Sequence, residues 1–192
     1  MFEFLTQTFN ASLIAVTQLL LSSVVTSNPW FDTFELQYMG LKQEIVCTTK
    51  LADSFTETLD DVLLSGQNIT LHFRFELYAP NEAEPLQVKE VVNGFRYDAE
   101  SESFYLFNSE SRELERFFTI EAAKDTYISV NNLVIVNTKE LSDELDYFIK
   151  VTAFLDPIKL DDMSESVNLM LRWASVKPTI VSDKFKVQTK AT

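Results

Sequence analysis

The sequence contains one histidine, one cysteine and only three glycines in 192 residues. One imidazole and one thiol cannot supply the clustered His and Cys ligands that most transition-metal sites use. Three glycines are too few for a glycine-rich phosphate loop, and no serine lies in a Gly-x-Ser-x-Gly turn. A single cysteine, Cys47, forms no intramolecular disulfide, so cysteine usage does not distinguish an oxidising from a reducing compartment. The inventory therefore excludes most metal sites and every glycine-rich phosphate loop.

Positive charge is also scarce. The chain carries 16 Lys and Arg against 29 Asp and Glu, which gives a net charge of −13. Such a field repels phosphate backbones, so we expect no nucleic-acid partner. Hydrophobic residues make up 46% of the chain and charged residues 23%, as in an ordinary globular domain, which excludes wholesale disorder.

An apolar segment lies near the N-terminus, from Ala11 to Val25, interrupted only by Ser, Thr and Gln. It is shorter than the roughly 20 apolar residues of a membrane span and fits the apolar region of a secretory signal. Ser27 offers a cleavage point, but the first ten residues carry Glu3 and no basic residue. We therefore expect residues 1–27 to be a signal peptide or a retained N-terminal anchor, and the protein to be exported, to the periplasm.

Alternation of apolar and polar residues predicts most of the remaining chain to be β-strand. The clearest strand is Ile69–Tyr78, with Leu71, Phe73 and Phe75 on the inward face and His72 on the polar face. The same pattern predicts further strands at Phe34–Tyr38, Ile45–Cys47, Tyr147–Leu155 and Val167–Trp173. In the last of these, Leu169, Leu171 and Trp173 are expected in the core, with Arg172 opposite. Two further segments, Leu86–Tyr97 and Ser103–Phe107, are predicted to form a hairpin that turns at Asp98–Ser101, although Asn93-Gly94 is the better two-residue turn by type. If the chain turns at Asp98, we expect Asn93-Gly94 to be a bulge.

Two helices are predicted between the strands. Ser54-Phe55-Thr56-Glu57 fits a capping box, and Gly66 fits the left-handed residue that closes a helix. The second helix is expected from about Thr119 to Val130, ended by Asn131-Asn132. Together these elements predict an antiparallel β-sandwich with two short helices packed on it. We expect one domain over residues 28–186 and a polar tail over residues 187–192.

Five segments, taken in order, resemble the bacterial family catalogued as domain of unknown function 4390. They are Phe55–Tyr78, Val91–Phe107, Phe118–Asn131 with its Glu121-Ala122 pair, Ile149–Pro157 and Val167–Ser175. The sequence departs from the family at Pro80-Asn81-Glu82-Ala83, where a Trp-rich turn is usual, at Lys150, where an Arg is usual nearby, and in lacking a basic start. The resemblance implies an exported β-rich domain. It implies no reaction and no functional residues.

Few residues are candidates for chemistry. His72 lies on the polar face of its strand, as a histidine in a cross-strand polar ladder does, and we expect neither catalytic residues nor a cofactor. The acidic loop between two strands offers weak calcium ligands. These are Asp156, Asp161, Asp162 and Glu165.

Three functions fit this sequence. The first is a non-enzymatic binding module of the cell envelope, which contacts a protein or apolar partner through a sheet edge or hydrophobic groove. The second is a carrier with an internal cavity for a lipid-like ligand. The third, ranked last, is a hydrolase of unrecognised type. The apolar run Leu133–Val136 bears on the first, because it is expected as a central strand, yet an open edge there would accept a partner strand.

Overall fold

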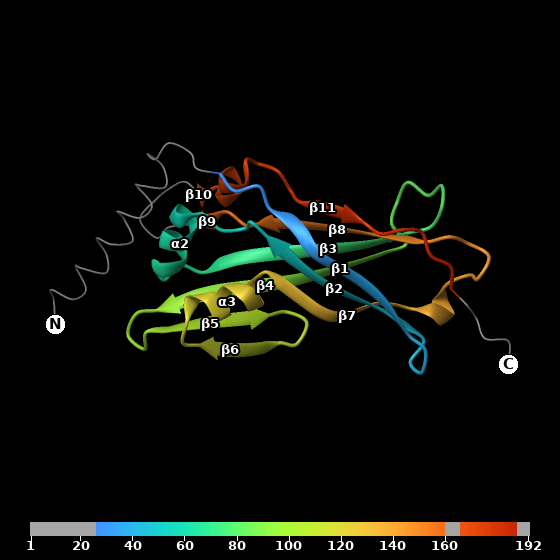
Figure 1. Ribbon diagram of the computed structural model, residues 1–192, viewed down its shortest axis with the longest axis horizontal. Coiled ribbons are helices and arrows are strands. Elements are labelled where there is room, and N and C mark those ends of the chain that lie inside the picture. The colour runs from blue at the N-terminus through green and yellow to red at the C-terminus, as the bar shows by residue number, and fades with distance from the viewer. Residues whose placement is uncertain (1–25, 160–165, 188–192) are drawn as a thin grey trace.

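The protein is a β-sandwich with two unequal sheets. The computed structural model describes residues 26–159 and 166–187 (Figure 1). The smaller sheet has the order β1-β2-β7, and its strands are β1 (Trp30–Met39), β2 (Glu44–Ala52) and β7 (Ser129–Asn137). The larger has the order β11-β8-β3-β4-β5-β6, and its strands are β3 (Ile69–Tyr78), β4 (Gln87–Asp98), β5 (Ser103–Asn108), β6 (Glu113–Phe117), β8 (Phe148–Leu155) and β11 (Thr179–Val181). Every paired strand is antiparallel, so the predicted fold class is confirmed.

The inner faces of the two sheets share one core. Leu71, Phe73 and Phe75 of β3 are buried, which confirms the phase that their alternation predicts. The Phe73 ring meets Phe31 of β1, with 6.5 Å between the ring centroids. Such contacts bury the apolar row of each sheet and leave the polar row of β3 on the outer face.

Two α-helices cover what the strands leave open. The helix α2 (Glu57–Leu64) packs against β4, and α3 (Ile120–Tyr127) packs on β5, β6 and β7 (Figure 1). Gly66 follows α2 with φ 80°, the left-handed conformation that its position predicts. The predicted cap is wrong by two residues: the N-cap is Thr56, whose hydroxyl accepts the Leu59 amide, while the Ser54 hydroxyl donates to the Ala52 carbonyl.

The second helix ends earlier than predicted. It stops at Tyr127, and Asn131-Asn132 lie inside β7, where the register with β2 shifts. Asn132 has φ 52° and donates its amide to the Thr48 hydroxyl. The two asparagines therefore form an irregularity in a strand instead of a helix end.

The prediction of a strand over Val167–Trp173 is wrong. Only Ser166–Val167 is extended, as β10 paired with β9 (Ile158–Lys159), and a 3-10 helix, η2, follows over Leu169–Trp173. Leu169 and Trp173 are buried as expected, but Leu171 is 56% exposed and Arg172 is buried. Trp173 is the last residue of η2, and its Nε1 donates to the Ser54 carbonyl at 2.9 Å.

Two further details of the sheets differ from the prediction. Asn93-Gly94 is not a bulge, because Asn93 pairs with Leu71 and Gly94 with Thr70 in unbroken register. The predicted hairpin turn after Asp98 is confirmed. Leu133–Val136 lies in β7, at the edge of its sheet and not at its centre. A second 3-10 turn, η1 (Thr138–Glu140), follows β7.

Candidate functional site

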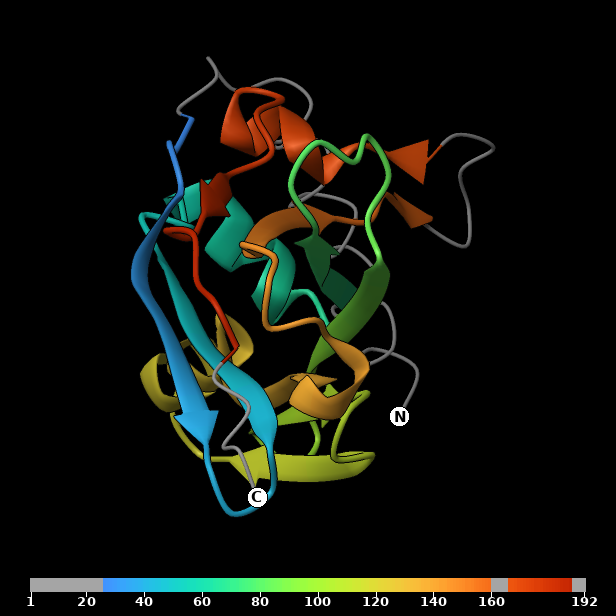
Figure 2. The same ribbon diagram turned by 90° about the vertical axis from the view of Figure 1, so that its right-hand side faces the viewer.

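The long edge strand β1 has a partner on one side only. Nine of its ten residues pair with β2, with Asp32 skipped at a register shift, and among the described residues no strand pairs with its other edge. An unpaired edge presents a row of backbone donors and acceptors to whatever lies beside it. In this molecule β11 and the segment after it lie alongside β1 (Figure 2).

The opposite edge of the same sheet, formed by β7, is blocked by side chains of β4. Lys89 donates from Nζ to the Val134 carbonyl. Asn93, which is buried, donates from Nδ2 to the Tyr127 carbonyl at 2.7 Å and to the Ser129 carbonyl at 3.2 Å. The Val134 and Ser129 carbonyls belong to β7, so these contacts occupy two backbone acceptors that an added strand could otherwise use.

The far edge of the larger sheet is protected by charge. The edge strand β6 has the sequence Glu-Leu-Glu-Arg-Phe, and its first four residues are exposed. Charged side chains on an edge discourage pairing with another chain. The outer edge of β1 has no paired strand among the described residues, although β1 carries exposed Asp32 and Glu35 and β11 lies beside it.

A groove of about 600 Å³ lies between β1 and the C-terminal segment. Its walls carry Phe34, Leu36 and Tyr38 from β1 and Val181 and Phe185 from the other side. The C-terminal wall is fixed by backbone hydrogen bonds, because the Tyr147 amide donates to the Phe185 carbonyl at 2.8 Å and the Phe185 amide donates to the Tyr147 carbonyl at 2.9 Å. A groove with apolar side chains beside a strand edge can hold an extended chain or an apolar ligand.

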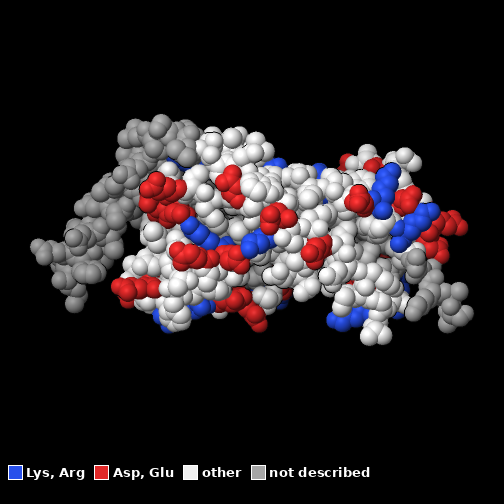
Figure 3. All heavy atoms as spheres, in the orientation of Figure 1, with Lys and Arg blue, Asp and Glu red and all other residues white. Residues whose placement is uncertain are grey.

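Two lysines stand at this groove. Lys184 and Lys186 contribute to its lining, together with Asp183. None of the ion pairs among residues 26–159 and 166–187 involves either lysine. Acidic and basic side chains are interspersed over the face shown in Figure 3, with acidic ones in excess in the chain as a whole.

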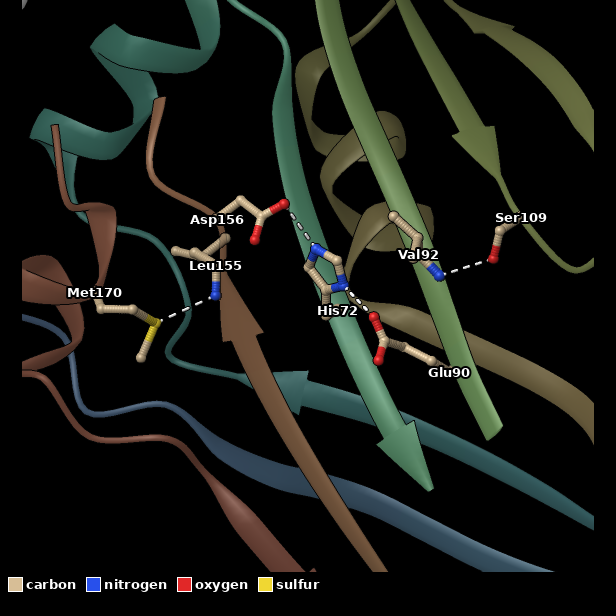
Figure 4. A network of polar contacts seen from close by, with 7 residues as sticks. All are labelled: His72, Glu90, Val92, Ser109, Leu155, Asp156 and Met170. Carbon is tan, nitrogen blue, oxygen red and sulfur yellow. Dashed lines mark hydrogen bonds and ion pairs between the residues drawn. The ribbon is translucent and has the colours of Figure 1, made fainter. Parts of the chain in front are cut away.

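His72 forms a second polar cluster, on the outer face of the larger sheet. Its Nδ1 lies 2.6 Å from Glu90 Oε1 on β4, and its Nε2 lies 2.8 Å from Asp156 Oδ2 after β8 (Figure 4). The ring stacks on Phe154, with 4.7 Å between the centroids. Burial acts to lower the pKa of His72, but the hydrogen bonds and charges of Asp156 and Glu90 act together to raise it above its usual value.

The geometry gives His72 the role of a cross-strand tie. Both ring nitrogens are engaged by carboxylates on opposite sides, so neither is free to accept a proton from a nucleophile or substrate. Farther along β3, Glu76 is held in the same way, by Arg74 Nε at 3.2 Å and Lys150 Nζ at 3.0 Å. These residues form a polar ladder across three strands.

The predicted calcium ligands do not form a described site. Asp156 binds His72, while Asp161, Asp162 and Glu165 lie outside the described residues. Within the described part of the chain, no three His, Cys, Asp or Glu side chains are placed to hold a metal ion.

Cys47 is fully buried on β2, and this burial raises the pKa of its thiol to about 12. A thiol with so high a pKa is protonated at neutral pH and unreactive.

The residues on the C-terminal wall of the groove were not singled out from the sequence. Val181, Phe185 and Val187 lie in a short segment near the predicted polar tail. These residues lie four and two positions apart, which is a weak sign of an extended segment with one apolar face. Its position beside β1 depends on pairing across the fold.

A family comparison agrees with the residues that carry the resemblance. The family model described as "Domain of unknown function (DUF4390)" matches residues 32–167, and the chain belongs to this family. No curated protein and no solved structure matches the sequence. Among the described residues, no helix has the length and apolar character to cross a membrane.

Proposed function

We propose that this member of the DUF4390 family is a non-enzymatic binding module, exported to the cell envelope, which holds a protein partner in the groove between β1 and the C-terminal segment. The observation that carries the proposal is the groove itself, which has a volume of about 600 Å³, holds both apolar and charged side chains, and is bordered by the unpaired edge of β1. An edge strand combined with apolar side chains supplies both backbone pairing and specificity.

The absence of an activated nucleophile in the described residues also supports a binding role. His72 is tied by two carboxylates, and the Cys47 thiol is buried and protonated. A His72→Gln, Cys47→Ala double variant should therefore fold and keep its partner. Loss of in vivo function as complete as deletion, from a double variant that is stable and correctly located, would favour the hydrolase instead.

Photocrosslinking in living cells tests where the partner binds. A benzophenone amino acid replaces Tyr38, which lies in the groove and is 52% exposed. The control replaces Phe107, an aromatic residue of similar exposure on β5, away from the groove. We expect a specific protein adduct at position 38, absent at 107 and lost when Leu36→Glu places a charge on the groove wall. Equal adducts at both positions, or none at position 38, would refute the groove as the binding site.

Export is tested separately with an alkaline phosphatase fused after Val187, since this enzyme is active only outside the cytoplasm. The apolar segment Ala11–Val25 supports export. We expect activity from the full-length fusion and none from a fusion that lacks residues 1–27. Ser27 is buried and donates its amide to the Arg172 carbonyl at 2.9 Å, so cleavage immediately after Ser27 would remove that contact. Equal activity of the two fusions would contradict export by this segment.

A lipid-like ligand is the alternative occupant of the same groove. The carrier hypothesis expects an internal cavity, whereas this groove opens at the surface beside an edge strand. Extraction of the purified protein with organic solvent, followed by mass spectrometry, would reveal a stoichiometric lipid if the carrier hypothesis is right.

A further inference from the structure

We propose that the groove accepts an extended peptide segment, which adds to β1 as a further strand and alternates apolar with acidic side chains. The inference rests on the proposed binding function and specifies the chemistry of its occupant. Three features of the described residues support it: the backbone edge, the side-chain row along the groove, and the two lysines.

The backbone edge favours a peptide over a compact ligand. The strand β1 is long and unpaired on the groove side, whereas the β7 edge is blocked by Lys89 and Asn93 and the β6 edge is charged. A protein with unprotected edges generally covers each of them, because any chain can pair with an open edge. The unpaired edge of β1 adjoins the groove, so pairing with an added strand would satisfy the free backbone groups there.

The side chains along the groove repeat every second residue. Phe34, Leu36 and Tyr38 all face it from β1. Strand residues repeat on one face at intervals of two, so an added strand would place every second side chain against this row. Five residues of strand span about 17 Å, which sets the length of the occupant's central part at roughly five residues.

The lysines define the charge of the occupant. Lys184 and Lys186 face the groove without an ion-pair partner among the described residues, and only Asp183 opposes them in the lining. Acidic side chains at the intervening positions of the added strand would reach them.

The same charges argue against a second copy of this chain as the occupant. Two copies paired through β1 would bring their own lysines to a shared interface, and each copy carries a net charge of −13. Like charges placed together oppose association, whereas a partner with a locally acidic strand gains from both lysines.

Synthetic peptides test the three features with the purified full-length chain. The first probe is a fluorescent nine-residue peptide of alternating Val and Glu, measured by fluorescence anisotropy at physiological salt, where the net charge of −13 is screened beyond about 8 Å. The second replaces each Glu by Lys, and the third keeps Glu but has Pro at the centre. We expect the Glu peptide to bind roughly 3- to 30-fold more tightly than the Lys peptide, which is what two exposed ion pairs supply. The central Pro removes a backbone donor and should weaken binding by about fivefold or more.

Charge reversal in the protein provides the matched control. A Lys184→Glu, Lys186→Glu double variant should reverse the preference for the Glu peptide. Lys177→Glu, which changes a lysine that lies over Phe154 outside the groove, should leave the preference intact. Circular dichroism confirms that each variant is folded before it is titrated.

Each outcome bears on a different part of the inference. Equal binding of the Glu and Lys peptides would overturn the charge argument, and undiminished binding of the Pro peptide would overturn strand addition. A dimer in sedimentation equilibrium that Leu36→Glu dissociates would identify a second copy as the occupant and overturn the inference. Failure of all peptides together with a specific crosslink at position 38 would refute this occupant and leave the proposed function standing. Failure of both would refute the two together.

Discussion

Replacement of His72 by Gln should make the stability of the protein less dependent on pH. His72 lies between Glu90 and Asp156, at 2.6 and 2.8 Å, and its side chain is only 14% exposed. The two carboxylates raise the pKa of the imidazole against the opposing effect of burial. The folded protein therefore holds this proton more tightly than the unfolded chain does.

The sign follows from that difference. A group whose pKa is raised in the folded state contributes stability fully below its unfolded pKa of about 6.5, and the contribution is lost as pH rises through the folded pKa. The partner carboxylates are 41% and 47% exposed, so each ion pair is screened by solvent. Two such pairs are worth about 1–2 kcal/mol together.

Urea unfolding at a series of pH values from 5 to 9 measures the effect, with the free energy of unfolding compared between wild type and His72→Gln. The wild-type advantage should be largest at pH 5 and should shrink by about 1–2 kcal/mol towards pH 9. Arg74→Gln is the matched control, since it removes a charge from the same face of β3 that does not titrate in this range. Parallel stability curves for wild type and His72→Gln, or an advantage that grows with pH, would refute the reasoning.

Three further predictions concern stability and reactivity. Phe73→Ala should lower the free energy of unfolding by about 3–5 kcal/mol, because the ring is fully buried against Phe31; a loss below 1 kcal/mol in urea would contradict this core. Thr56→Ala should lower the free energy of unfolding by about 1 kcal/mol and Ser54→Ala by about half as much, because Thr56 caps the helix. The reverse order in urea unfolding would indicate that Ser54 is the cap after all. Cys47 should resist iodoacetamide at pH 8 until urea unfolds the chain, as followed by mass spectrometry; rapid labelling of the folded protein would show an accessible thiol.

The strands that were predicted correctly are those with a long alternation of apolar and polar residues, because this pattern alone indicates which face is buried. Alternation over Ile69–Tyr78 extends for ten residues, and the strand β3 has the same bounds. Alternation over Val167–Trp173 is shorter, and a short apolar pattern is ambiguous between a strand and a helical turn. In the structure most of this segment is a 3-10 helix, and Trp173 at its end contacts Ser54, a residue far away in the sequence. Local alternation carries no information about such a contact.

The candidate site could not be predicted from local sequence pattern either, because it too depends on contacts between distant segments. The polar face of His72 was predictable from period two, but its carboxylate partners are 18 and 84 residues away. The groove joins β1 to a segment about 150 positions later, and the expected central strand over Leu133–Val136 is an edge because β2 pairs with it from one side only. Which strands become neighbours is a property of the whole sheet, and no single segment encodes it.

The treatment of strand edges links this fold to the proposed function. Lys89 lies on the same row of β4 as Asn93, on the side that faces the core, where a charged side chain is costly unless it finds a partner. Its partner is the Val134 carbonyl at the β7 edge, so an inward charge is used to close that edge. Like β6, β1 carries exposed charge, at Asp32 and Glu35, but its outer edge has no paired strand among the described residues. The peptide strand proposed above would occupy this edge, beside a groove with two lysines that have no ion-pair partner among the described residues.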